Sequence, residues 1–280
     1  MSKKQQILET AIQLFAEYGI EATSIQHITK STGISKGAFY LSFASKEDLI
    51  KEIIDTFMKQ FVADIDRVVN TPLLADEKLQ NYFSAHLNLL EKHADFAKMY
   101  AQEQMYSINE EILEKLMYYD ALIDRSLLSL FQELFPLQTE QQAIDLLVSI
   151  KGLIRIYSQL ILFHPYPHDT TRIVEVLVEK TMLLGEHSKT FYLTMEMVKL
   201  PVTSESQLPT TSQIHVVIEE LQKERHPELI EETFEVLREE LQREHPRQAV
   251  LQGLYGHLIA YTPTKWLSYL VKQIDTKKDA

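Results

Sequence analysis

The stretch that decides the fold is residues 23–46, TSIQHITKSTGISKGAFYLSFASK. It predicts two short helices joined by a tight turn, followed by the start of a third helix. Thr23 is suited to cap the first helix, because Gln26 follows it at the three-residue spacing of a capping box. Gly33 marks the turn, since glycine adopts a positive φ without a Cβ clash. Ser35 is the natural N-cap of the second helix.

Two helices that cross through a short glycine-containing turn form the helix-turn-helix of DNA-binding proteins, whose second helix enters the major groove. Lys36 offers a cation to phosphate or guanine, and Tyr40 offers a hydroxyl to phosphate. Gly37 costs about 1 kcal/mol relative to alanine in a helix, which favours a close approach of the backbone to DNA. Lys46, at a helix start, suits a further phosphate. The predicted DNA-contacting residues are Thr23, Ser24, Ser35, Lys36, Gly37, Ala38, Tyr40 and Lys46.

Four segments resemble the N-terminal DNA-binding domain of TetR-type repressors, namely AIQLFAEYG at 11–19, TSIQHI at 23–28, GISKGAFY at 33–40 and FASKEDL at 43–49. The resemblance implies a ligand-responsive, homodimeric transcription regulator, and it disfavours a helix-turn-helix that serves packing alone. The chain departs from the family at Thr29, where alanine is usual. It departs again at Leu41, where a polar or basic residue is frequent.

Composition predicts an all-α protein with more than one domain. The 280 residues suggest about two domains, and 7 Gly and 9 Pro leave few turns between long helices. The absence of Cys excludes disulfides and thiolate metal sites, and it fits a reducing cytoplasm. The first residues, MSKKQQ, lack the apolar core of a signal peptide, so we expect a cytoplasmic protein.

The net charge of −12 lies entirely outside the first 50 residues. Residues 1–50 contain five Lys and five acidic residues, so their charge is 5 − 5 = 0. An uncharged N-terminal domain (the head) with lysines near its predicted recognition helix can bind DNA, while charge repulsion keeps the acidic body away from the DNA. The weak basic surplus predicts that two heads must act together, as in a homodimer on a palindromic operator.

The chain predicts three regions. Residues 1–46 form the helix-turn-helix domain, 47–200 form a helical ligand-binding and dimerisation body, and 201–280 form a linker and a C-terminal helical extension. Ser45 caps a long helix, from 46 to about 70, that leaves the head and enters the body. A small tilt at the far end of this helix would move the recognition helix.

Helices over 76–93, 95–106 and 109–135 mix aromatic and Met residues with polar ones. Ordinary core packing explains each of these residues singly. The resemblance, however, implies an effector pocket in this part of the body, and apolar walls with few polar anchors suit a lipophilic or amphipathic effector. The candidate ligand-binding residues are Tyr82, His86, Met99, Tyr100, Glu103, Met117, Phe131, Arg155 and Tyr157.

The segment 139–163 is apolar enough to span a bilayer, but Asp145, Lys151 and Arg155 within it argue against that location. A helix that is apolar nearly all round is buried on every side. With a helix over 171–187 it would complete a four-helix dimer interface, since the resemblance implies dimerisation through the last two body helices.

The sequence predicts no metal site and no cofactor. HPYPH at 164–168 has two His four residues apart, but its two prolines favour a rigid turn. Motifs such as GxSxG, GxxxxGK and GxGxxG are absent, so we expect no enzyme. The alternatives are an enzyme without a recognisable motif and a helical protein-interaction module that does not bind DNA.

The extension is longer than the resemblance leads us to expect, because a TetR-like chain would end near residue 200. A Pro-, Ser- and Thr-rich linker at 201–212 precedes predicted helices at 213–224, 228–244, 247–260 and 264–275. The extension would pack on the body or on the partner subunit. It would then either widen the dimer interface or cover the mouth of the pocket.

Overall fold

The computed structural model describes residues 3–106, 110–136, 139–164, 167–198, 209–243 and 246–275. These residues form helices without any strand, so the all-α prediction is confirmed for the described part of the chain. The chain divides into two compact units. The first comprises Met1–Phe61 and Arg67–Val202, and the second comprises Val62–Asp66 and Thr203–Ala280. The predicted boundary at residue 46 stays a prediction.

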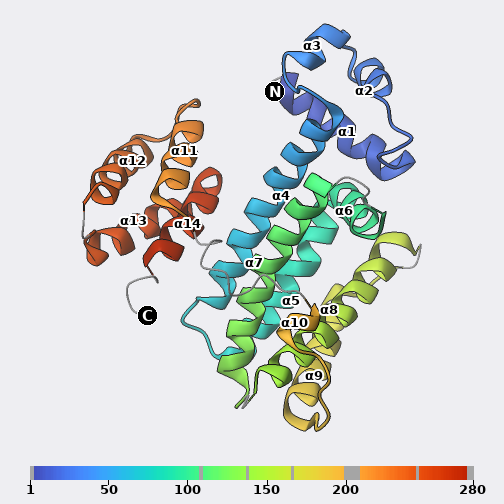
Figure 1. Cartoon of the computed structure of the whole chain (residues 1–280), viewed down its shortest axis with the longest axis vertical. Helices are drawn as coiled ribbons and strands as arrows, with labels where there is room; N and C mark the ends of the chain where they lie inside the picture. The colour runs from blue at the N-terminus through green and yellow to red at the C-terminus, as the bar shows by residue number, and fades with distance from the viewer. Residues whose placement is uncertain are drawn as a thin grey trace. The chain divides into compact units, whose positions relative to one another are not determined.

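The first unit begins with a three-helix head, α1 (Lys3–Tyr18), α2 (Ile25–Thr32) and α3 (Lys36–Tyr40) (Figure 1). Gly19 and Gly33 end α1 and α2 with φ angles of 82° and 74°, in the left-handed region that favours glycine. The buried core of the head includes Ile7, Ala11, Phe15, Ile28, Phe39 and Phe43.

Serine side chains cap the helices of the head. As predicted, the Ser35 hydroxyl accepts a hydrogen bond from the Ala38 amide at 3.1 Å. The prediction that Thr23 caps α2 is wrong, because the cap is Ser24, which accepts from the His27 amide at 3.1 Å. The Thr23 hydroxyl instead turns inward and donates to the Gly19 carbonyl at 2.8 Å, which satisfies the end of α1.

The long helix α4 (Lys46–Val69) leaves the head and runs along the body (Figure 1). Ser45 caps it, accepting from the Asp48 amide at 3.0 Å, as predicted. The body helices are α5 (Ala75–Lys92), α6 (Ala94–Tyr106), α7 (Glu110–Leu134), α8 (Glu140–Phe163), α9 (Thr170–His187) and the short α10 (Met195–Val198). The helices from α5 to α9 begin and end within one residue of the predicted positions, whereas α10 was not predicted.

Asp55 joins α4 to α7 through hydrogen bonds and charge. Its carboxylate accepts hydrogen bonds from Lys115 Nζ at 2.6 Å and from the Tyr119 hydroxyl at 2.7 Å. Burial and the neighbouring Asp55 charge raise the pKa of Tyr119 above its ordinary value, so Tyr119 stays protonated and acts as the donor. The helix that carries the head is therefore fixed to the body at its middle.

The second unit contains the helices of the extension, α11 (Thr211–Leu221), α12 (Glu228–Leu241), α13 (Gln248–Ala260) and α14 (Lys265–Asp275), with the 3₁₀ turn η2 (Thr262–Thr264). All four predicted helices are present. Apolar side chains from each helix form a core of its own, which includes Ile214, Ile218, Phe234, Leu237, Leu251, Leu258, Leu267 and Leu270.

A buried carboxylate fixes the connection between α12 and α13. The Glu240 side chain is only 1% exposed and lies 2.7 Å from Arg247 Nη2 and 3.3 Å from Arg243 Nε. It also accepts a hydrogen bond from the Arg247 backbone amide, at the N-cap of α13. The Arg247 side chain, then its backbone amide, lower the pKa of Glu240 to about 2.

We expect the Glu240→Gln variant to unfold at a lower temperature than the wild type at pH 7, because two arginines lose their buried anionic partner. The folded pKa of Glu240 lies below its ordinary value of 4.5. The carboxylate therefore stabilises the fold above about pH 4.5, and this contribution is lost as the pH falls through about 2. Circular dichroism melts between pH 7 and pH 2.5 should show the difference between variant and wild type shrinking with acid. Equal melting temperatures at pH 7 would contradict the role assigned to Glu240.

Candidate DNA interface and effector region

Helix α3 has one buried face and one open face. Phe39 is 0% exposed and anchors the helix in the head, whereas Lys36, Gly37 and Tyr40 are exposed. Ala38 is half-buried between these two faces. The structure therefore brings the predicted cation and hydroxyl donor onto one open surface of a helix-turn-helix, the arrangement that contacts DNA in such proteins.

Nothing in the folded chain requires glycine at position 37. A Cβ added there would meet only the Ser35 hydroxyl oxygen, at 3.8 Å, which is an ordinary contact. Glycine weakens a helix, and the contacts of the described residues do not explain its presence here. A close approach of the α3 backbone to a DNA strand would explain it.

Leu41 extends the open surface of α3. It follows the last residue of the helix and is 90% exposed, directly after the exposed Tyr40. This is one of the two positions at which the chain departs from the TetR pattern. The other, Thr29, is buried, and its hydroxyl donates to the Gln26 carbonyl at 3.1 Å.

Two predicted DNA contacts have partners inside the head. Lys46 Nζ donates to the carbonyls of Ile20 at 2.9 Å and Thr23 at 3.2 Å, which uses two of its three N–H donors. The Thr23 side chain is 0% exposed. Both residues thus hold the loop between α1 and α2, while the exposed Ser24 and Ser35 cap α2 and α3.

The predicted ligand residues differ widely in burial. Tyr82, Met99 and Phe131 belong to the fully buried core. The side chains of His86, Tyr100 and Tyr157 are half-buried, whereas Met117 and Arg155 are exposed. The side chain of Glu103 lies outside the described residues. These residues therefore differ in accessibility, and several of them border one polar cluster.

This polar cluster centres on Asp124, which is 2% exposed and accepts a hydrogen bond from Lys151 Nζ at 2.7 Å. Lys151 also lies 3.8 Å from Asp120, whose carboxylate accepts from the Tyr100 hydroxyl at 3.2 Å. Burial raises the pKa of Asp124 to about 6, and the Lys151 charge opposes that rise. The cluster therefore places a cation that is about one-third exposed beside a buried carboxyl whose pKa is raised.

His86 lies in the same region with an unused nitrogen. Its Nδ1 is buried and has no hydrogen-bond partner among the described residues. Burial, and then the Lys151 charge, lower the pKa of His86 to about 4, so the ring is neutral at pH 7. The sequence predicted His86 and Tyr100 but missed the three charged residues of the cluster. The sequence could have marked these three residues, because they are charged and lie within otherwise apolar helices.

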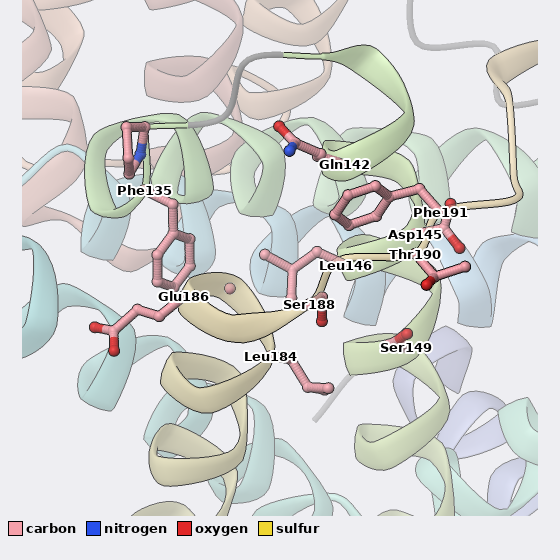
Figure 2. A pocket seen from close by; sticks show the side chains of 12 residues that line it. Phe135, Gln142, Asp145, Leu146, Ser149, Leu184, Glu186, Ser188, Thr190 and Phe191 are labelled. Carbon is pink, nitrogen blue, oxygen red and sulfur yellow. The ribbon is translucent and has the colours of Figure 1, made fainter.

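The structure also contains a cavity of about 410 Å³ that the sequence did not indicate. It lies between the end of α7, the first turns of α8, the end of α9 and the segment that follows α9 (Figure 2). Of the predicted ligand residues whose side chains the structure describes, none lines it. Within the described residues, no group of three or more His, Asp or Glu side chains could hold a metal ion. Residues 165 and 166 of the HPYPH segment lie outside the described part.

Comparisons with known proteins agree with this geometry. Residues 7–53 match the family model of bacterial regulatory proteins, tetR family. The HTH-type transcriptional regulator YerO of Bacillus subtilis is 27% identical over 91% of this chain and 89% of its own length. Another regulator from that organism, YuxN, is 27% identical over 97% of this chain and 98% of its own length, so its likeness includes the C-terminal extension.

Two further comparisons cover less of the chain. The HTH-type transcriptional repressor KstR2 of Mycobacterium tuberculosis is 32% identical over 36% of this chain and 51% of its own length. The transcriptional regulator FadR from Bacillus subtilis, solved in complex with stearoyl-CoA, shares the fold with a TM-score of 0.56 and 23% identity. That likeness covers 97% of FadR but 65% of this chain. Together these comparisons show that residues 7–53 match the tetR family of bacterial regulatory proteins, and that the chain resembles HTH-type transcriptional regulators over nearly its whole length.

Proposed function

We propose that the protein is a ligand-responsive repressor that binds a palindromic operator as a homodimer and is released by a small lipophilic or amphipathic effector. The observation that carries this proposal is the open face of α3, which presents Lys36, Gly37 and Tyr40 from a capped helix-turn-helix. Two such helices, related by a twofold axis, would enter successive major grooves about 34–36 Å apart.

An exposed apolar stripe supports the homodimer. Helix α8 is long and apolar enough to cross a membrane, yet only 28% of its apolar window is buried within the chain. Its exposed apolar residues are Val148, Ile156, Leu160 and Phe163, and α9 adds Leu183. A second copy of this chain would cover the stripe, as the family resemblance implies, and would remove apolar surface from water.

The polar cluster supports an effector in the body. Lys151 and His86 are polar anchors within apolar surroundings, the combination found in small-molecule sites. The relative FadR binds stearoyl-CoA, an anionic amphiphile, and Lys151 suits such a charge. An effector that moved α7 would pull on α4 through Asp55 and thereby move the head. Releasing DNA in this way requires several kcal/mol of differential affinity between the two conformations.

This proposal includes a cytoplasmic location and no enzymatic activity, in keeping with relatives that are named transcriptional regulators. The rival function is a helical interaction module that does not bind DNA. The exposure of Lys36 and Tyr40 favours the DNA-binding function, because both lie on the helix that meets DNA in helix-turn-helix proteins.

We expect Lys36→Ala and Tyr40→Ala to weaken operator binding about tenfold each or more, because each removes a contact to DNA. Operator DNA would first be selected from a random pool with the wild-type protein, and affinities would then be measured by fluorescence anisotropy. Wild-type affinity should fall steeply as salt rises, and less steeply for Lys36→Ala, which has one phosphate contact fewer. A salt-independent affinity, or dimers lost in either variant, would contradict the proposal.

Gly37→Ala should weaken operator binding without destabilising the protein. Alanine fits the folded chain and improves the helix by about 1 kcal/mol, but its methyl group would keep the α3 backbone away from the phosphates. The measurement pairs a thermal melt with an operator titration. The matched control is Gly253→Ala in α13, where an added Cβ also meets open space. Unchanged DNA affinity in Gly37→Ala would refute close backbone contact.

Ile156→Glu should convert dimers into monomers, because it places a charge in the centre of the apolar stripe. Sedimentation velocity would give the oligomeric state, and the operator titration should show a parallel loss of affinity, since one head alone carries no net charge. Glu175→Gln on the exposed face of α9 is the control. A monomeric wild type would rule out this interface.

A further inference from the structure

The cavity of about 410 Å³ has the size of a small-molecule site. Phe135 at the end of α7, Leu146 on α8 and Phe191 beyond α9 form its apolar walls. Figure 2 shows Phe135 and Phe191 on opposite sides of Leu146. Gly185 makes this arrangement possible, because a Cβ at that position would clash with the Phe135 ring.

A carboxylate holds the outer wall in place. One oxygen of Asp145, Oδ2, accepts hydrogen bonds from the backbone amides of Tyr192 at 2.9 Å and Leu193 at 2.8 Å. These bonds tie the segment 188–193 to the first turns of α8. The segment contributes Ser188, Thr190 and Phe191 to the lining, so this wall of the cavity has both polar and apolar side chains.

The electrostatic character of the cavity is negative. Of the twelve described residues that line it, none is Lys, Arg or His, whereas two, Asp145 and Glu186, are carboxylates. The last turn of α9 also lines the cavity and adds the partial negative charge of a helix C-terminus. The positive end of α8 is offset by its cap, because the Thr139 hydroxyl accepts from the Gln142 amide at 3.3 Å.

We propose that this cavity binds an organic cation with an aromatic or aliphatic body. The apolar walls would bury the body, while Asp145 and, from the exposed rim, Glu186 would attract the charge. The Glu186 carboxylate lies 3.9 Å from His187 Nε2, outside the lining. A carboxylate or phosphate ligand would meet two like charges and no Lys, Arg or His among the described lining residues. The site is separate from the cluster around Asp124 and does not depend on DNA binding.

The test uses two probes of matched shape and opposite charge, tetraphenylphosphonium and tetraphenylborate, titrated into the full-length protein by calorimetry. The cation should bind and the anion should not. Asp145→Asn and Glu186→Gln together should weaken binding of the cation roughly tenfold or more. The control is Glu175→Gln, which removes an acidic charge that does not line the cavity and should leave the affinity unchanged.

Asp145→Asn could also loosen the segment 188–193, so a melt accompanies each titration. Where that variant melts earlier than the wild type, Glu186→Gln alone decides the outcome. Equal binding of the two probes, or equal affinity in Glu186→Gln and Glu175→Gln, would overturn the proposal. The titration contains no DNA, so a protein that binds the cation but no operator would refute the repressor function and leave this site standing.

Discussion

The recognition surface depends on the burial of one aromatic side chain. A helix of five residues is far shorter than isolated helices that are stable in water, so α3 takes its conformation from its neighbours. Phe39 is fully buried, and its ring centroid lies 5.8 Å from that of Phe43. The left-handed Gly33 sets the angle at which the chain enters α3. The apolar face thus orients Lys36 and Tyr40 on the opposite face before any DNA is present.

Helix α4 connects the head to the body, because its first turns pack in the head and its later turns pack in the body. Its first turns bury Leu49, Ile50 and Ile53. Two residues later, Asp55 accepts hydrogen bonds from two side chains of α7. Packed helices shift as units rather than deform continuously, so a displacement of α7 would reach the head through α4. In the proposed function, regulation therefore acts through this contact between two helices.

Local chemistry made much of this fold predictable. Helical periodicity located every helix from α5 to α9 within one residue, and the turn at Gly33 and the caps at Ser35 and Ser45 follow from single-residue conformational preferences. The N-cap of α2 shows the limit of such reasoning, because we predicted Thr23 and the structure has Ser24. Both can cap a helix, and the choice depended on the Gly19 carbonyl, which the folded loop brings to within 2.8 Å of the Thr23 hydroxyl.

The effector region was less predictable because its contacts join residues that are distant along the chain. Lys151 and Asp124 are 27 residues apart, and Asp145 and Leu193 are 48 apart. In the second pair the donor is a backbone amide, which nearly every residue possesses, so no sequence pattern could mark it. Periodicity locates a helix face, but it does not identify which distant segment covers that face.

The two polar environments of the body differ in charge. In the first, Lys151 lies between the carboxyl groups of Asp124 and Asp120. The second has the carboxylates Asp145 and Glu186 and no Lys, Arg or His among its described lining residues. A ligand is rejected most strongly where its charge meets a like charge that cannot be screened. In the proposed function, an anionic amphiphile would therefore have to replace a carboxylate partner of Lys151 in the first environment, whereas organic cations suit the second. Because the whole net charge of −12 lies outside the head, the body as a whole also attracts cations toward its surface.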